Sequence, residues 1–170
     1  MARGTSLRQG GDLIMDDRRY MQEALRMAHA GIGAGNSPFG ACVAGDGRII
    51  SCRHNEVLET TDITAHAEIL ALRDACTARG TIDLSGCTLY STAEPCPMCF
   101  AAAHWARIAR IVYAVPMDAV WEAGFREIPF FAQEFLDLPG VDMEVTGGIC
   151  SEEGYRLLEI WRSRPDRQVY

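Results

Sequence analysis

The chain contains no lysine: all 16 of its basic side chains are arginine, and 23 acidic side chains give it a formal net charge of −7. A protein that binds a long nucleic acid relies mainly on basic side chains that neutralise phosphates. The acidic balance therefore weakly disfavours a polynucleotide substrate, unless a local basic patch offsets it. The one basic cluster of note, residues 162–167, is short and is interrupted by Asp166.

Long apolar runs are also missing. No run approaches the roughly 20 residues that a membrane-spanning helix needs. The opening residues 1–11 include arginines but lack the apolar core of a secretory signal. We therefore expect a cytoplasmic protein that does not act at a membrane.

The cysteines form no regular framework. Their number is odd and they are scattered, which is not typical of a disulfide scaffold and is typical of a reducing compartment. We therefore expect free thiols that a metal can use. The seven positions are Cys42, Cys52, Cys76, Cys87, Cys96, Cys99 and Cys150.

The overall composition is that of a soluble globular protein. Hydrophobic residues make up 48% of the 170 residues and charged residues 23%. This length suits one domain with a single core. We expect one domain over residues 1–170, with residues 1–11 disordered and a C-terminal helix and tail over residues 151–170.

Hydrophobic periodicity and turn residues predict alternating helices and strands. An amphipathic helix over residues 12–33 should precede a β-hairpin that turns at residues 45–47, Gly-Asp-Gly. The later order of strand, helix and strand implies a crossover connection and a partly parallel sheet. The predicted strands are 39–44, 48–53, 87–92, 108–115 and, at an edge, 141–145. The predicted helices are 65–79, capped by Thr64; 97–106; 119–124; and a final helix that Ser151 caps and that ends at Trp161. The segment 128–140 is expected to be irregular.

Two short strings stand at the starts of two predicted helices. One is His-Ala-Glu at residues 66–68, and the other is Pro-Cys-Pro-Met-Cys at residues 95–99. Side chains in the first turn of a helix lean toward its N-terminus, and residues three apart share a face. The histidine, the two cysteines and the glutamate can therefore converge on one point.

These residue types in this pattern are typical of a catalytic zinc site. One imidazole, His66, and two thiolates, Cys96 and Cys99, give zinc three protein ligands and leave the fourth tetrahedral position to water. Zinc lowers the pKa of bound water from about 15.7 to about 7. Glu68 can take that water's proton, pass it to a ring nitrogen and then protonate a departing amine. The pattern therefore predicts one zinc ion per chain and a hydrolytic deamination.

Either string alone has plainer explanations. His-x-Glu occurs by chance in many helices, and Cys-x-x-Cys can be a redox pair, half of a structural zinc site or two core cysteines. A structural four-ligand site, completed by one of the other five cysteines, is a further alternative. The combination, at the starts of two helices separated by one strand, is far more specific than either part.

With these motifs the chain resembles the cytidine deaminase superfamily. His-x-Glu followed by Pro-Cys-x-x-Cys is the signature of zinc-dependent deaminases of nucleobases and nucleosides. The likeness spans residues 15–125 and is strongest at residues 64–68 and 94–99. It implies an α/β fold, a three-layer α/β/α sandwich over a mixed five-stranded sheet. It also implies dimers or larger assemblies, and we expect a homodimer.

Further strings are similar to bacterial guanine deaminases and plant guanosine deaminases. They are Pro38-Phe39-Gly40, His54-Asn55, His104-Trp105-Ala106-Arg107, Glu122-Ala123-Gly124-Phe125 and the aromatic Tyr170. The resemblance implies that Asn55 hydrogen-bonds the purine and that Phe39 and Trp105 flank the flat base. Ala67 belongs to the same substrate-binding set. Taken alone, an asparagine after a strand is more often a turn residue, and such aromatic residues are usually core.

The resemblance also implies two roles near the end of the chain. Glu127 falls where these enzymes carry a second catalytic acidic residue near the leaving amine. Tyr170 resembles the terminal aromatic residue that closes the pocket, sometimes from a partner subunit. As bare sequence features, the first is a surface carboxylate and the second a frayed end.

Some positions depart from the guanine deaminase pattern. Ile63 stands where a proline commonly precedes Thr-Ala-His, and Ala102 and Ala103 replace a more usual Gly-Ala pair. Arg126 and Glu127 replace two consecutive acidic residues. Because pocket shape decides which base is accepted, such changes can redirect the enzyme to guanosine, cytosine or an aminotriazine.

Our leading hypothesis is hydrolytic deamination of a free aminopurine, guanine first, to xanthine and ammonia. A tRNA-editing adenosine deaminase is the main rival, because it uses the same metal site, but it needs a basic track for the anticodon arm. Outside the enzymes, the alternative is a structural zinc module that serves as an interaction domain. Glu68 argues against that module, because a structural site has no use for an unliganded carboxylate beside the metal.

Overall fold

A five-stranded mixed sheet forms the centre of the molecule. The computed structural model describes residues 10–170, with side chains from residue 15 onward. The strands are β1 (Gly40–Gly45), β2 (Arg48–His54), β3 (Thr88–Ala93), β4 (Arg110–Val115) and β5 (Glu144–Thr146), in the spatial order β2-β1-β3-β4-β5. β1 pairs antiparallel with β2 and β3, whereas β3, β4 and β5 run parallel. The predicted partly parallel sheet is confirmed.

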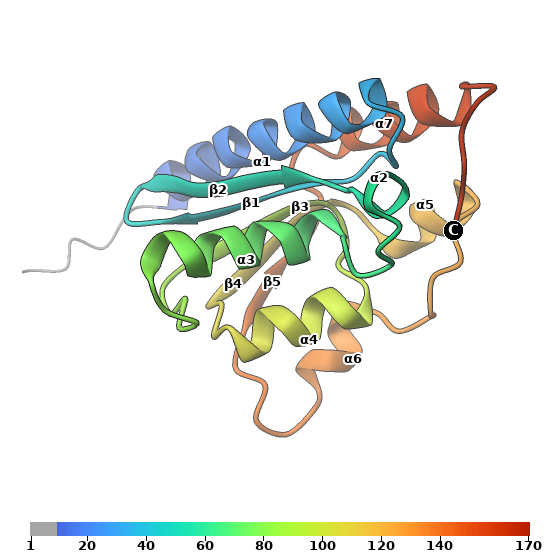
Figure 1. Cartoon of the computed structure of the whole chain (residues 1–170). Coiled ribbons are helices and arrows are strands. Elements are labelled where there is room, and N and C mark those ends of the chain that lie inside the picture. Colours follow the sequence, from blue (N-terminus) through green and yellow to red (C-terminus); the bar gives the residue numbers. More distant parts are fainter. Residues whose placement is uncertain (1–9) are drawn as a thin grey trace, which may run out of the picture.

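Helices cover both faces of this sheet (Figure 1). One layer contains α1 (Gly10–Gly33) and α7 (Ser151–Arg162), and the other contains α3 (Ala67–Arg79) and α4 (Pro97–Trp105). Each layer buries its own hydrophobic cluster against the sheet. The predicted three-layer α/β/α sandwich is therefore confirmed. In the described residues, no helix is long and apolar enough to cross a membrane.

The opening helix has the predicted amphipathic face. The apolar residues Met21, Ala24, Leu25, Ala28 and Ile32 are all buried against the sheet. Gly40 lets the helix approach β1 closely, because a Cβ there would lie 2.1 Å from the carbonyl oxygen of Ala24. The expected disorder of residues 1–11 falls on residues 1–9, which lie outside the described residues, and on Gly10 and Gly11, which begin α1.

The hairpin of β1 and β2 forms where the sequence predicts it. Asp46 and Gly47 have φ angles of 55° and 74°, as a two-residue hairpin turn with a right-handed twist requires. Cys42 and Cys52 are direct partners in the register of the two strands and form a disulfide. The expectation that all seven cysteines are free thiols is therefore wrong for this pair. The linear sequence did not reveal that the hairpin register places them opposite each other.

The short elements differ most from the predictions. The helix α2 (Val57–Thr60) was not expected, and the segment 128–140, predicted to be irregular, contains the helix α6 (Ala132–Leu136). The edge strand covers residues 144–146 rather than 141–145, and the short helix α5 (Met117–Glu122) begins two residues before the predicted 119–124. Helices this short are stabilised by tertiary contacts rather than by propensity, so periodicity is a weak guide to them.

Both predicted helix caps are also wrong. Thr64 donates through its hydroxyl to the carboxylate of Asp62, and the N-cap residue of α3 is His66. The N-cap residue of α7 is Cys150, so Ser151 is its first helical residue. α3 therefore begins two residues later than its predicted cap implied, and α7 begins one residue earlier.

Candidate active site

Two helix starts position the residues of the metal-binding motif. His66 is the N-cap residue of α3, and Cys96 is the N-cap residue of α4, both with extended backbone angles. Pro97 occupies the first position of α4, where a missing N–H costs nothing. Cys99 follows Cys96 by three residues and so lies on the same side of the first turn. Because α3 and α4 pack against each other, their starts bring the three side chains together.

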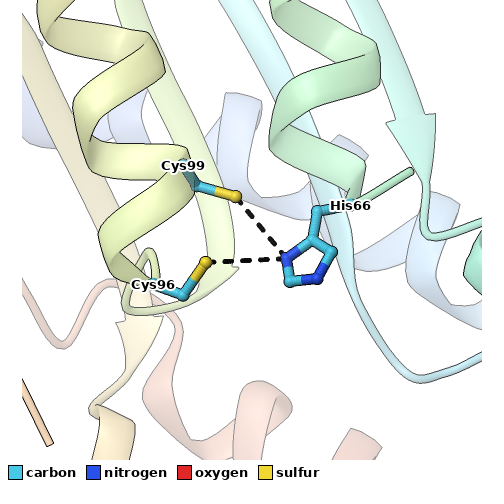
Figure 2. A group of neighbouring side chains, drawn as sticks. All are labelled: His66, Cys96 and Cys99. Atoms are coloured by element: carbon cyan, nitrogen blue, oxygen red, sulfur yellow. Dashed lines mark hydrogen bonds between the residues drawn. The ribbon is translucent and has the colours of Figure 1, made fainter. Parts of the chain in front are cut away.

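Figure 2 shows the three side chains pointing toward one another. The Nδ1 atom of His66 lies 3.7 Å from the Sγ atom of Cys96 and 3.6 Å from that of Cys99. The three ligand atoms all lie within 4.8 Å of one another, which is the spacing of donors around one metal ion. Among the described residues, this is the one such group of three or more His, Cys, Asp or Glu side chains. Cysteines outside the motif do not join it, so the structural four-ligand alternative has no support.

The electrostatics of the two thiols fit a zinc ion. A hydrogen bond from Cys99 is the largest of the effects that lower the pKa of Cys96 to about 4, and His66 lowers it further. Burial raises the pKa of Cys99 well above its ordinary value. With Cys96 as a thiolate, the buried group of two sulfur atoms and one imidazole nitrogen carries a negative charge. A cation bound between the three atoms balances that charge. One histidine and two cysteines are ligands that zinc prefers.

Glu68 stands next to this group without belonging to it. It lies in the first turn of α3 and is 6% exposed. The Ser91 hydroxyl on β3 donates a hydrogen bond of 3.2 Å to its Oε1 atom. Burial raises the pKa of Glu68 above its ordinary value, while the nearby imidazole of His66 opposes the shift. A buried carboxyl group with a raised pKa beside a candidate metal site is suited to exchange protons.

A pocket opens from the metal-binding residues to the surface. Its outer part has a volume of about 360 Å³, and a narrow inner cavity of about 20 Å³ adjoins Glu68. Glu127 lines both parts, as do His66 and Cys96. Burial, and next the negative charge of Cys96, raise the pKa of Glu127 to about 7. The fold therefore brings a second carboxyl group to the site from a distant part of the sequence.

Tyr170 closes one side of this pocket. Its hydroxyl accepts a hydrogen bond of 2.7 Å from the carboxamide of Asn55, which is fully buried. The Oδ1 atom of Asn55 accepts a further bond of 3.1 Å from the backbone N–H of Val57. The Tyr170 ring also lies near His66, with 5.9 Å between ring centroids. A purine that hydrogen-bonds to Asn55 would therefore meet Tyr170 of the same chain.

The other predicted contact residues lie in three different places. Phe39 lines the inner cavity, and its ring meets that of Phe125 edge to face at 4.8 Å. The side chain of Ala67 is buried in the core beside the sheet, which leaves only its backbone for a substrate. Trp105 is 76% exposed and lines neither part of the pocket. It stands at the far end of α4, about 13 Å of helix rise beyond Cys96, so within one chain it does not flank a bound base.

Several residues of the site were missed by sequence reasoning. Ser91 donates a side-chain hydrogen bond to Glu68, and its only signal is a hydroxyl group in a buried strand that also contains Thr88 and Thr92. Glu94 begins the string Glu-Pro-Cys-Pro-Met-Cys of residues 94–99, where the family likeness is strong, yet no role was assigned to it. Two further pocket walls, Pro97 and Met98, belong to the quoted string of residues 95–99. The walls for which no motif gave a signal are Ala93, Met117, Val120 and Ile128.

Comparisons of sequence agree with this geometry. Residues 14–115 match the family described as the cytidine and deoxycytidylate deaminase zinc-binding region. The chain is 34% identical to a guanine deaminase of Bacillus subtilis over 158 residues, which is 92% of this chain and all of that protein. It is 42% identical to a tRNA-specific adenosine deaminase of Aquifex aeolicus over 100 residues, which is 59% of this chain and 66% of that protein.

A solved structure has the same fold over almost the whole chain. The guanine deaminase of Nitrosomonas europaea superposes with a TM-score of 0.81 at 29% sequence identity. The match covers 96% of this chain and 99% of that one. The likeness therefore extends well beyond residue 115 and includes the segment that carries Glu127.

Proposed function

This chain belongs to the cytidine and deoxycytidylate deaminase family, and from that premise we propose that it is a single-domain deaminase of a free aminopurine, with guanine as the substrate and xanthine and ammonia as the products. Its enzyme class is established by the family: it is a zinc-dependent hydrolase that removes an amino group from a nucleobase or nucleoside. The choice of base is the part that we propose.

One observation carries the choice of guanine. The family match ends at Val115, whereas Glu127 and Tyr170, which line the pocket, lie beyond it. The likeness to the Bacillus guanine deaminase covers 92% of the chain and so extends well past Val115. The likeness to the Aquifex tRNA deaminase, although higher in identity, covers 59%. Another tRNA-specific adenosine deaminase, of Buchnera aphidicola, matches 84% of the chain at 32% identity, so it is below the guanine deaminase in both coverage and identity. Coverage and identity together therefore support guanine.

In the proposed reaction, His66, Cys96 and Cys99 would hold the zinc ion. When bound there, zinc acidifies water and so supplies a nucleophile at neutral pH. Glu68 would take a first proton from the attacking water and give it to the ring nitrogen, and would then carry the proton of the added hydroxyl group to the departing amine. Its burial keeps bulk water from competing for those protons, and the Ser91 hydroxyl holds its carboxylate in place.

The remaining roles concern the base itself. Phe39 provides an apolar wall for the flat ring. Asn55 lines neither part of the pocket, so it hydrogen-bonds the edge of the base in exchange for its bond to the Tyr170 hydroxyl. Glu127, with its pKa of about 7, accepts a hydrogen bond from the leaving amine or donates one to it as ammonia departs. Tyr170 covers the bound base from the solvent side. Rim residues Ile63, Met98 and Ile128 make the outer pocket largely apolar, which suits a base better than a ribose phosphate.

A tRNA adenosine deaminase is the second candidate, and the 42% identity to the Aquifex enzyme favours it. The charges of the chain oppose it. Within the basic cluster of residues 162–167, Arg164 is bound to the carboxylate of Asp166 at 2.8 and 3.0 Å and to the carbonyl oxygen of Ile32. Part of that cluster's charge is therefore neutralised within the chain, which leaves little for phosphates.

The same proposal includes a cytoplasmic homodimer. Trp105 and Ile82 are 76% and 79% exposed, and they lie on adjacent segments, because the N–H of Leu84 donates to the carbonyl oxygen of Ala106. Such exposed apolar side chains are typical of surfaces that a partner covers. Sedimentation velocity of the wild type and of Trp105→Ser tests this: a monomer in both cases contradicts the dimer.

Ammonia release by the zinc-loaded protein tests the choice of base. The panel contains guanine, guanosine, adenine, cytosine, ammeline and a tRNA with adenosine at the wobble position. We expect turnover of guanine far above that of every other compound. Turnover of the tRNA, with a steep loss at higher salt, would instead support the second candidate. Turnover of another free base would keep the mechanism and refute guanine as the substrate.

A further inference from the structure

Glu94 is a buried carboxylate that the proposed reaction does not use. It directly follows β3 and is separated from the N-cap residue Cys96 by Pro95. Only 5% of its surface is exposed, and its backbone N–H donates to the carbonyl oxygen of Val115 at 2.8 Å. A carboxylate is rarely buried to this degree unless its oxygens are hydrogen-bonded. Its partners therefore indicate what it does.

Both oxygens of Glu94 accept hydrogen bonds from backbone N–H groups of one later segment. Oε2 accepts from Met117 at 3.0 Å, and Oε1 accepts from Ala132 at 2.7 Å. These are the first residues of α5 and α6. A single carboxylate thus holds the two ends of the segment 117–132 to the end of β3, right beside the start of α4.

The segment held in this way carries two residues of the site. Phe125, which packs against Phe39, and Glu127, which lines both parts of the pocket, lie between the two anchored ends. Within the segment, the indole N–H of Trp121 donates to the backbone oxygen of Glu127 at 3.0 Å. Glu127 is therefore fixed to its own segment, and the segment is fixed to the metal-binding motif by Glu94.

We infer that Glu94 is a positioning residue that holds Glu127 at the metal site. It acts through the segment 117–132 and not by contact with the substrate. The inference rests on the proposed role of Glu127 at the leaving amine. It also gives the string Glu94-Pro95-Cys96 a second function. The loop that supplies the ligand Cys96 also sets, through Glu94, the distance between the metal site and the carboxylate of Glu127.

The substitution Glu94→Gln tests this with a minimal change of shape. Glutamine keeps one oxygen acceptor, but its NH₂ group cannot accept from a backbone N–H, so one of the two anchors is lost and an amide N–H loses its partner. We expect kcat/KM for the deaminated base to fall by at least about tenfold, mainly through kcat, because a misplaced acid–base group costs rate more than binding. Zinc content should stay at the wild-type level.

A double-mutant cycle separates positioning from a general structural role. If Glu94 acts through Glu127, then Glu94→Gln in a Glu127→Gln background should change kcat/KM less than about twofold, because coupled residues are not additive. If the loss of kcat/KM in the double variant equals the product of the losses in the two single variants, the inference is overturned. Glu134→Gln is the matched control. Glu134 also accepts a hydrogen bond from a backbone N–H at the start of α6, at 2.7 Å, but it is exposed. Its bond joins residues three apart and does not tie the segment to the end of β3. This variant should keep wild-type kinetics.

Hydrogen exchange provides a readout that does not depend on the substrate. In Glu94→Gln we expect the Met117 or Ala132 amide to lose protection, while the amides of α3 keep theirs. Retained protection of both amides would overturn the inference even if activity falls. If the wild type fails to deaminate guanine, the proposed substrate is wrong, but the exchange result still decides whether Glu94 holds the segment. The cycle is then run with the base that the panel identifies.

Discussion

Replacement of Glu68 by glutamine should abolish turnover without loss of the metal. The two side chains have the same shape, so the oxygen that accepts the 3.2 Å hydrogen bond from Ser91 is kept. Glutamine cannot carry a proton, however, and Glu68 is 6% exposed, so water has little access to replace it. General acid–base catalysis typically contributes about 10²- to 10⁴-fold. Because Glu68 handles protons in more than one step, we expect a loss near the upper end.

A 10⁴-fold loss corresponds to about 5 kcal/mol of lost transition-state stabilisation. The assay is ammonia release from guanine at saturating and at limiting concentrations, with metal analysis of the same samples. Glu68 is not among the clustered ligand atoms, so one zinc ion per chain should remain. The exposed Glu122 is the control, and Glu122→Gln should keep wild-type turnover.

The stability of the metal-free variant gives an independent check. Burial raises the pKa of Glu68 above its unfolded value, so the wild type should lose stability as the pH rises from the unfolded pKa through the raised folded one. Glu68→Gln has no proton to lose and should not show this decline. Wild-type turnover in Glu68→Gln would refute the assignment of Glu68 as the proton carrier. Loss of zinc from the variant would show instead that Glu68 supports the metal.

Three further predictions concern the rest of the molecule. Cys96→Ser should lose zinc and turnover together, because it removes the thiol with the lowered pKa. Metal analysis after gel filtration checks this. A fully zinc-loaded variant would contradict the assignment of Cys96 as a ligand. Asp17→Asn should lower the free energy of unfolding by about 3 kcal/mol, because it breaks a partly buried ion pair with Arg110 at 2.8 and 2.9 Å. Denaturant unfolding measures this loss. The value of kcat should be unchanged, because the ion pair lies at the end of the sheet away from the pocket. Carbon-13 NMR of the metal-free protein should give Glu127 a pKa of about 7, and zinc should lower it, because a nearby cation favours the carboxylate; an ordinary carboxyl pKa in the metal-free protein would contradict the burial of Glu127.

Much of the site was predictable because its residues lie in local strings. His66, Cys96, Cys99 and Glu68 stand at fixed short spacings at helix starts, and helix geometry alone lets each pair address one point. The long helices, the hairpin turn and the mixed sheet also follow from periodicity and turn residues over many positions. Zinc follows from the chemistry of the donors. These features depend on the chain within a few residues of each position, which is why a linear reading could reach them.

Tertiary structure decided what depends on the meeting of distant segments. The disulfide of Cys42 and Cys52 depends on strand register, and α5 and α6 begin where a buried glutamate far away in the chain accepts their first N–H groups. Trp105 was expected beside the base, but the length of α4 places it on the surface, away from the pocket. By itself the sequence determined the group of His66, Cys96 and Cys99, the carboxylate of Glu68 beside it and the type of fold, because these are set by local spacing. Only the folded chain decided how Glu127 and Tyr170 reach the metal site, because hydrogen bonds and packing between residues far apart in sequence place them there.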